Sequence, residues 1–244
     1  MDFRLNEAMI TADEPINCWV FKIYGLSPLE LADSVAGVDL RHNARFSIVE
    51  DYPDLTLRLA LDKADVQESS RLREQVHAFL GSYIYAEGDR TLEEVVGELL
   101  LAKGKTLALA ESCTGGYLSH RITRVAGSSA YFYGGVITYS NEAKVLFLGV
   151  KPETLEQNGA VSSETALEMS AGIRERTGAS VGLSVTGVAG PGGGSVEKPV
   201  GTVWISINGE GYPEARRFQF EGQRERIIAA TSQAALDWLR LSLL

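Results

Sequence analysis

The chain has 244 residues, of which 45% are hydrophobic, so it is long enough to bury a substantial core. Its 32 acidic residues outnumber 23 basic ones, and the formal net charge of -9 argues against sequence-independent binding to nucleic acid or anionic membranes. Cys18 and Cys113 form no metal-ligand pattern, and neither a signal peptide nor a membrane span is evident, so we expect a soluble, cytoplasmic protein without a metal.

The first 90 residues predict a small α+β domain. CWVFKIYG (18–25) has the pattern of a strand, and Ser27 followed by Pro28 marks the start of a helix over 27–35. The alternating segments ARFSIVED and LTLRLALD predict a hairpin. Helical spacing from Asp65 to Leu80 and a short strand in YIYAEGD complete a β-α-β-β-α-β order. This part carries 16 acidic and 9 basic residues, so it holds most of the net negative charge.

The remaining residues, 91–244, predict a layered α/β domain in which helices and strands alternate. Helices are expected at 91–104, 115–127, from 141 onward, at 162–178 and from about 223 to the end. Strands are expected at 106–111, 134–140, 181–187, 201–208 and 215–222.

The segment AESCTGG (110–116) lies where a strand gives way to a helix, and its residues permit three interpretations. One of Ser112, Cys113 and Thr114 could cap the helix. An anion could instead rest on the amides of the helix start. Alternatively, a serine at this turn could be exposed as a nucleophile, although the GxSxG pattern is absent.

A second candidate segment is TGVAGPGGGSVEKPVG (186–201), in which six of sixteen residues are glycine. A mobile surface loop would have this composition. The segment also follows a predicted strand directly, and ligands bind at the carboxyl ends of strands in α/β sheets. Either interpretation fits the residues alone.

A reactive serine needs a base, and the histidines are poor candidates. His42 and His77 belong to the first domain, and His120 falls within a predicted helix. Lys144, in TYSNEAK, is the other possibility, although most lysines are exposed. Its pKa would have to fall from about 10.4 toward 7 or 8, through burial or nearby cations.

Three stretches in this order closely resemble the carboxyl-terminal domain of the CinA (competence/damage-inducible) family of nicotinamide-nucleotide amidases. They are AESCTGGYLSHRITRVAGSSAYFYGGVITYSNEAK, GAVSSETA and SVTGVAGPGGGSVEKPVGTVWISI, and the resemblance covers about residues 90–244. It implies hydrolysis of the carboxamide of nicotinamide mononucleotide to nicotinate mononucleotide and ammonia, without a metal or organic cofactor.

The resemblance also implies roles for individual residues. Ser112 would be the nucleophile and Lys144 its partner, and Cys113 would pack beneath the turn. The substrate-binding residues it implies are Thr114, Gly115 and Gly116 at the pocket floor, Tyr139 and Asn141 ahead of Lys144, and Thr186, Gly187, Ala189 and Gly190 in the facing loop.

One segment departs from the family pattern. Relatives usually carry GDR and a second arginine three or four residues later, a suitable cradle for a phosphate, whereas this chain reads GQRERII. Arg224 fits the pattern, and Arg226 would lie on a different face of the helix. A nucleotide-binding module without turnover is therefore the alternative to an active amidase.

The first domain resembles, more weakly, the KH-like domain that precedes the amidase domain in the family. It contains no GxxG loop and is acidic, so RNA binding is not expected. The family's amino-terminal pyrophosphatase domain, which is similar to molybdopterin-binding proteins, is missing from the sequence, so we expect no such activity. The family and the hairpin's open edge favour a homodimer.

Overall fold

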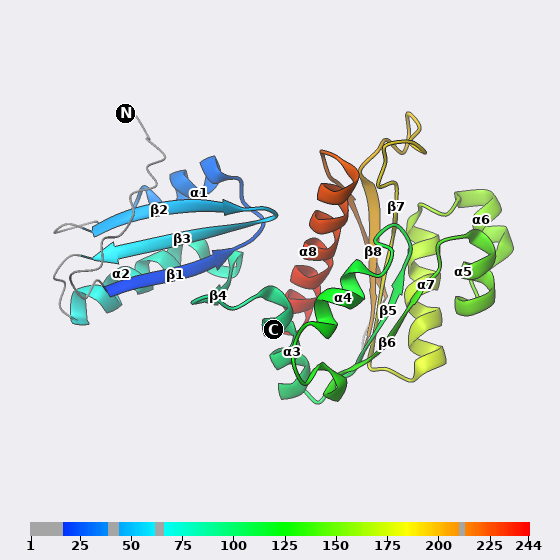
Figure 1. Cartoon of the computed structure of the whole chain (residues 1–244), viewed down its shortest axis with the longest axis horizontal. Coiled ribbons are helices and arrows are strands. Elements are labelled where there is room, and N and C mark those ends of the chain that lie inside the picture. Colours follow the sequence, from blue (N-terminus) through cyan, green and yellow to red (C-terminus); the bar gives the residue numbers. More distant parts are fainter. Residues whose placement is uncertain (1–16, 39–43, 62–65, 210–212) are drawn as a thin grey trace. The chain divides into compact units, whose positions relative to one another are not determined.

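A computed structural model describes residues 17–38, 44–61, 66–209 and 213–244, which divide into two compact units, Met1–Thr91 and Leu92–Leu244 (Figure 1). The opening segment, on which the expected absence of a signal peptide rests, lies outside the described residues, as do His42 and the expected helix start at Asp65. The mixture of helices and two sheets confirms the predicted α/β class.

The first unit is a four-stranded antiparallel sheet in the order β2-β3-β1-β4, with both helices contributing to one core. Ser27 caps α1, as the sequence indicated, and Glu30 completes a capping box with it. Leu57 and Leu59 of β3 are fully buried in this core, together with Leu72 of α2. The KH-like identity of this unit remains a prediction. Its elements are β1 (Asn17–Ile23), α1 (Pro28–Val35), β2 (Ala44–Asp51), β3 (Asp54–Leu61), α2 (Val66–Leu80), η1 (Gly81–Tyr83) and β4 (Ile84–Glu87).

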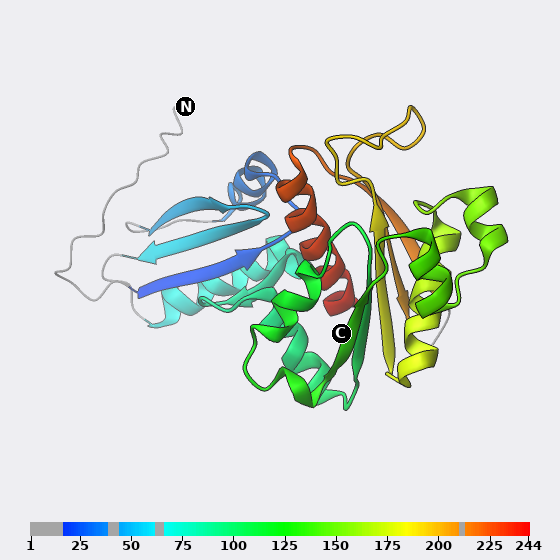
Figure 2. The ribbon, with the colours of Figure 1, turned by 45° about the vertical axis from the view of Figure 1, so that its right-hand side comes forward.

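The second unit is a five-stranded mixed sheet between two layers of helices. The strand order is β6-β5-β7-β8-β9, in which β5, β6 and β7 are parallel and β8 and β9 run antiparallel to their neighbours. Helices α3, α4 and α8 cover one face, and α5, α6 and α7 cover the other (Figures 1 and 2). The elements are α3 (Leu92–Ala102), β5 (Leu107–Glu111), α4 (Tyr117–Thr123), η2 (Ser128–Ala130), β6 (Phe132–Ile137), α5 (Asn141–Leu148), α6 (Pro152–Asn158), α7 (Ser163–Thr177), β7 (Val181–Gly187), β8 (Thr202–Asn208), β9 (Glu214–Gln219) and α8 (Arg224–Ser242).

Several elements differ from the sequence-based expectation, among them strand β6, which spans Phe132–Ile137 instead of 134–140, and strand β9, which ends at Gln219 instead of residue 222. Helix α4 ends at Thr123 instead of continuing to residue 127, because the chain turns through Gly127, whose φ of +82° is left-handed. The short helix α6 was not expected, although Pro152 occupies its first turn.

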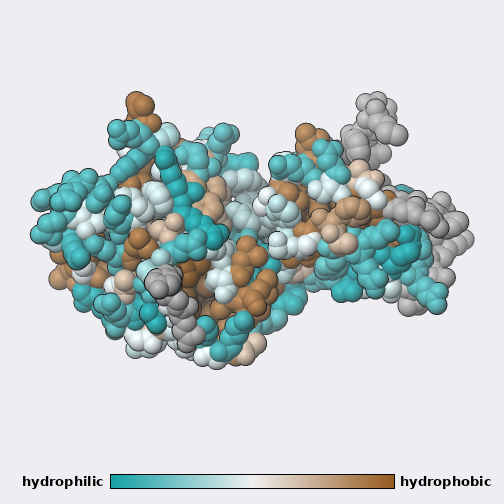
Figure 3. All heavy atoms as spheres, turned by 180° about the vertical axis from the view of Figure 1, so that it is seen from behind, coloured by the Kyte–Doolittle hydropathy of each residue, from teal (hydrophilic) through white to brown (hydrophobic). Residues whose placement is uncertain are grey.

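The surface seen from behind is largely hydrophilic, with exposed apolar residues in small groups (Figure 3). None of the helices in the described ranges is both long enough and apolar enough to cross a lipid bilayer.

Candidate functional site

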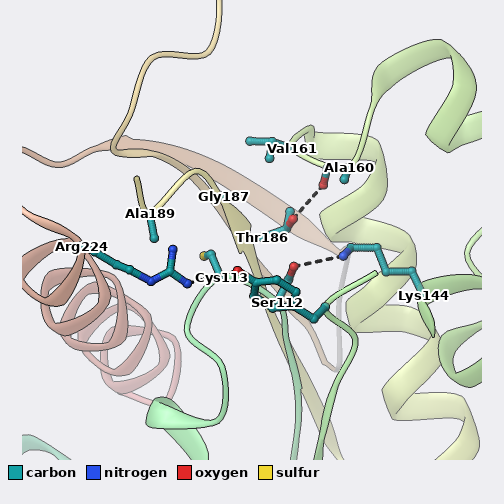
Figure 4. Close-up of a pocket in the computed structure, with 10 residues that line it drawn as sticks. Ser112, Cys113, Lys144, Ala160, Val161, Thr186, Gly187, Ala189 and Arg224 are labelled. Atoms are coloured by element: carbon teal, nitrogen blue, oxygen red, sulfur yellow. Dashed lines mark hydrogen bonds between the residues drawn. The ribbon is translucent and has the colours of Figure 1, made fainter. Parts of the chain in front are cut away.

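A small pocket lies where the parallel strands β5, β6 and β7 end, the edge at which α/β sheets bind ligands (Figure 4). Its volume is about 210 Å³. Side chains reach it from the turn after β5, the β6–α5 connection, the α6–α7 connection, the end of β7 and the start of α8. The residues that line it are Ser112, Cys113, Tyr139, Lys144, Ala160, Val161, Thr186, Gly187, Ala189 and Arg224.

Ser112 occupies the first position of the turn that follows β5. Its N–H donates to the carbonyl of Val185 on the neighbouring strand at 3.0 Å, which fixes the start of the turn. Gly115 and Gly116 then adopt φ angles of +61° and +97°, conformations that other residues rarely tolerate. The glycine pair therefore serves the sharp reversal that leaves Ser112 facing the pocket.

A buried carboxylate holds the helix start that follows this turn. Glu111 is fully buried, and its two oxygens accept hydrogen bonds from the N–H groups of Gly116, Leu118 and Ser119 and from the Ser119 hydroxyl, at 2.6 to 3.1 Å. The helix-start interpretation of AESCTGG was thus right, but the cap is the Glu111 side chain and none of residues 112–114. A carboxylate ending the apolar strand LALAE was the available signal.

Lys144 reaches Ser112 from helix α5, whose start Ser140 caps by accepting from the N–H of Ala143 at 3.1 Å. The Lys144 side chain is 1% exposed. Its Nζ donates to Ser112 Oγ at 3.0 Å and to the carbonyl of Thr138 at 2.7 Å. Burial lowers the pKa of this ammonium from 10.5 to about 8, in the range that a general base requires.

Cys113 was expected to pack beneath the turn, and it is buried there, but it also lines the pocket beside Ser112. Residues 112–116 form a tight turn, which brings both residues to the same space. Burial raises the pKa of the Cys113 thiol to about 12, so almost none of it is thiolate at neutral pH. The hydroxyl of Ser112, in contrast, is in direct contact with the Lys144 amine.

The opposite side of the pocket is held together by two polar contacts. The Thr186 hydroxyl donates to the carbonyl of Ala160 at 2.7 Å, which ties the end of β7 to the α6–α7 connection (Figure 4). Arg224 reaches in from the start of α8 and donates to the carbonyl of Gly190 at 2.9 Å and to the Tyr139 hydroxyl at 3.1 Å. Its guanidinium is a cation suited to an anionic part of a ligand.

Five of the predicted binding residues do not line the pocket: Thr114, Gly115, Gly116, Asn141 and Gly190. The first three lie where the backbone turns into the Glu111 cap, and Asn141 is an exposed residue at the first position of α5. Gly190 contributes through its carbonyl, which accepts from Arg224. The pocket residues that the sequence did not single out, Ala160 and Val161, are small and apolar and carried no chemical signal.

The remaining candidate groups lie away from the pocket. His120 is exposed on α4, and His77 contacts Glu87 in the first unit. Arg226 is exposed and does not line the pocket. Within the described ranges, no group of three or more His, Cys, Asp or Glu residues is placed to hold a metal ion.

Known proteins match the part of the chain that contains the pocket. The family model described as the CinA C-terminal domain matches residues 89–243. A protein of Moorella thermoacetica, named as competence-damage inducible, is 46% identical over 229 residues, which are 92% of this chain and 55% of that protein. A CinA-like protein of Geotalea daltonii is 42% identical over 230 residues, 92% of this chain and 56% of that protein. The chain thus spans about half the length of the curated relatives it matches.

Two solved structures each align with 63% of this chain. A CinA superfamily protein from Klebsiella pneumoniae 700603 aligns with a TM-score of 0.61 and 38% identity, over 63% of this chain and 98% of that one. A competence/damage inducible protein from Agrobacterium tumefaciens aligns with a TM-score of 0.59 and 39% identity, over 63% of this chain and 96% of that one.

Proposed function

Because this chain belongs to the CinA family, whose C-terminal domain model matches well over half of it, we propose that it hydrolyses the carboxamide of nicotinamide mononucleotide. The products are nicotinate mononucleotide and ammonia, which places the reaction in pyridine nucleotide recycling. The observation that carries this proposal is the 3.0 Å contact between the buried Nζ of Lys144 and Ser112 Oγ inside the pocket. Burial of a lysine ammonium away from water costs free energy. A buried lysine in contact with a serine hydroxyl therefore supports a functional role for the pair.

The pocket geometry supports a defined first step. The neutral Lys144 amine donates one N–H to the Thr138 carbonyl, so its lone pair can accept the proton of the Ser112 hydroxyl. Ser112 Oγ then bonds to the carboxamide carbon, and the electron pair of the C=O bond moves to the oxygen. The result is a tetrahedral intermediate with an oxyanion and a protonated Lys144.

Collapse of that intermediate releases ammonia. The oxyanion re-forms the carbonyl, the carbon–nitrogen bond breaks, and Lys144 returns its proton to the leaving nitrogen. Water then attacks the carbonyl carbon of the resulting ester on Ser112, with Lys144 again accepting a proton. The bond between that carbon and Ser112 Oγ breaks, Lys144 returns the proton to Oγ, and nicotinate mononucleotide departs. Every proton is exchanged between groups in the pocket and water, so the scheme has no step that needs a metal.

The size and charge of the pocket fit a single ring with an anionic extension. A volume of about 210 Å³ is below the roughly 300–1,000 Å³ of sites that enclose a drug-sized ligand. We place the pyridine carboxamide inside the pocket and the ribose phosphate at its open side. Arg224 is then the residue that contacts the phosphate, although the neighbouring GQRERII departs from the family pattern.

Mutant kinetics test the paired roles. Ser112→Ala and Lys144→Ala should each lower kcat by a factor of about 10³ or more, and the double variant should be scarcely slower, because residues that act as one unit are strongly non-additive. Ammonia release is the readout, and circular dichroism controls for folding. Multiplicative losses in the double variant would contradict a shared step.

Two further expectations stay proposals. We propose a cytoplasmic location, because Cys18 and Cys113 are both free thiols, as is usual in a reducing compartment. We also keep the homodimer as a prediction, which light scattering at micromolar concentration tests; a monomeric mass would refute it.

A further inference from the structure

The backbone N–H groups of residues 112–119 can be accounted for one by one. Six of them have acceptors. The N–H of Ser112 donates to Val185, that of Gly115 to Ser112, and that of Tyr117 to Thr114, at 3.0 to 3.1 Å. The N–H groups of Gly116, Leu118 and Ser119 donate to the Glu111 carboxylate. The N–H of Thr114 has no hydrogen-bond acceptor among the described residues, and that of Cys113 has none beyond the sulfur of its own side chain.

These two N–H groups belong to residues that are almost fully buried. Cys113 is 6% exposed and Thr114 is 3% exposed. The Thr114 hydroxyl is also buried without a hydrogen-bond partner among the described residues. Buried backbone donors without an acceptor are rare in proteins, because such a group loses its bond to water and gains nothing in return. Two adjacent backbone N–H groups that no other residue accepts from, directly after a candidate nucleophile, indicate that a ligand supplies the acceptor.

The Glu111 carboxylate determines which backbone N–H groups of this turn remain available to bind a ligand. It occupies the N–H groups at the start of α4, so the anion site that the sequence indicated there is filled by the protein itself. The unoccupied donors lie earlier in the turn, next to Ser112. The oxyanion would form on the carbon bonded to Ser112 Oγ, and the available donors belong to the two residues that follow Ser112 directly.

We propose that the N–H groups of Cys113 and Thr114 form the oxyanion hole of this site. Glu111 is the positioning residue, because its carboxylate occupies the N–H groups at the start of α4 that would otherwise compete for the oxyanion. The inference rests on the proposed amide hydrolysis and adds the groups that stabilise its intermediate. Neither donor bonds to another residue before the reaction, so both are available to the charge that develops in the transition state. Such preorganised donors are a large source of rate enhancement in acyl transfer.

Amide-to-ester substitution tests this directly, because it replaces one N–H by an oxygen and leaves the side chain in place. α-Hydroxy acid analogues introduced at 113 or 114 by nonsense suppression should each lower kcat for nicotinamide mononucleotide by about 10²–10³-fold, with KM nearly unchanged. The same substitution at Tyr117, whose N–H already donates to Thr114, is the matched control and should keep kcat within a few-fold of the wild type.

A second readout locates the donors without changing the chain. Pyridine-3-boronic acid should form a tetrahedral adduct on Ser112 Oγ and move the amide proton resonances of Cys113 and Thr114 more than that of Ala189 in the facing loop. An active wild type whose ester variants at 113 and 114 keep their kcat, or an adduct that shifts Ala189 alone, would overturn the oxyanion hole and leave the amidase proposal standing. A wild type that releases no ammonia and forms no adduct would overturn both.

Discussion

Replacement of Lys144 by methionine should reveal the depressed pKa of its amine as a pH-dependent difference in stability. Methionine keeps most of the length of the side chain and removes its charge. In the folded wild type, burial lowers the Lys144 pKa to about 8, whereas the unfolded chain has the ordinary value of about 10.4. Between these two values the unfolded chain holds a proton that the folded chain has lost, so the stability of the wild type rises with pH there.

The magnitude follows from the two pKa values. Below pH 8 both states are protonated, and the folded state bears a desolvation cost of roughly 3 kcal/mol, at 1.36 kcal/mol per pKa unit. This cost disappears as pH rises toward 10.4. The free energy of unfolding of the wild type minus that of Lys144→Met should therefore increase by about 2–3 kcal/mol between pH 7 and pH 10.

Urea denaturation of both proteins at a series of pH values is the assay. Subtracting the variant cancels every other titrating group, and Lys103→Met, which removes an exposed ammonium, controls for the change in net charge. In parallel, kcat/KM of the wild type should rise with pH around an apparent pKa near 8, because only the neutral amine accepts the Ser112 proton. A stability difference that is flat from pH 7 to pH 10 would refute a depressed pKa and remove the base from the mechanism.

Two other substitutions have defined outcomes. Glu111→Gln should lower the free energy of unfolding by about 2–4 kcal/mol in urea denaturation, because an amide offers one acceptor oxygen to four donors and turns an NH₂ group toward some of them. A loss below about 0.5 kcal/mol would mean that the carboxylate does not hold the turn. Arg224→Met should raise KM for nicotinamide mononucleotide tenfold or more, as expected for a charge-assisted contact, and leave KM for the phosphate-free nucleoside nearly unchanged. Equal effects on both substrates would show that Arg224 does not contact the phosphate.

Much of the fold could be predicted from the sequence because its signals are local. The Ser27–Glu30 capping box starts α1 where expected, and the alternating segments of residues 44–61 pair as a hairpin. The strand at 181–187 and the helix from 163 to 177 also lie where periodicity placed them. Helix α6 was missed because it is only seven residues long and too short for periodicity to stand out.

The site was predictable only in part, since several of its features arise from tertiary packing. Ser112 and Lys144 were named from the resemblance, but 32 residues separate them, and the burial that lowers the Lys144 pKa depends on how α5 packs beside the turn. Glu111 could not be assigned a role without knowing that its carboxylate folds back over the start of α4. The free N–H groups of Cys113 and Thr114 appear only when every hydrogen bond of the turn is known.

Ammonia release from nicotinamide mononucleotide by three purified proteins tests the central claim most directly. The wild type should release one ammonia for each nicotinate mononucleotide formed. Cys113→Ala should retain most of that rate, because alanine keeps the backbone N–H and the thiol is not ionised at neutral pH. Ser112→Ala should lose nearly all of it while remaining folded. A wild type that binds the nucleotide and releases no ammonia, or an active Ser112→Ala beside a folded and inactive Cys113→Ala, would contradict the account.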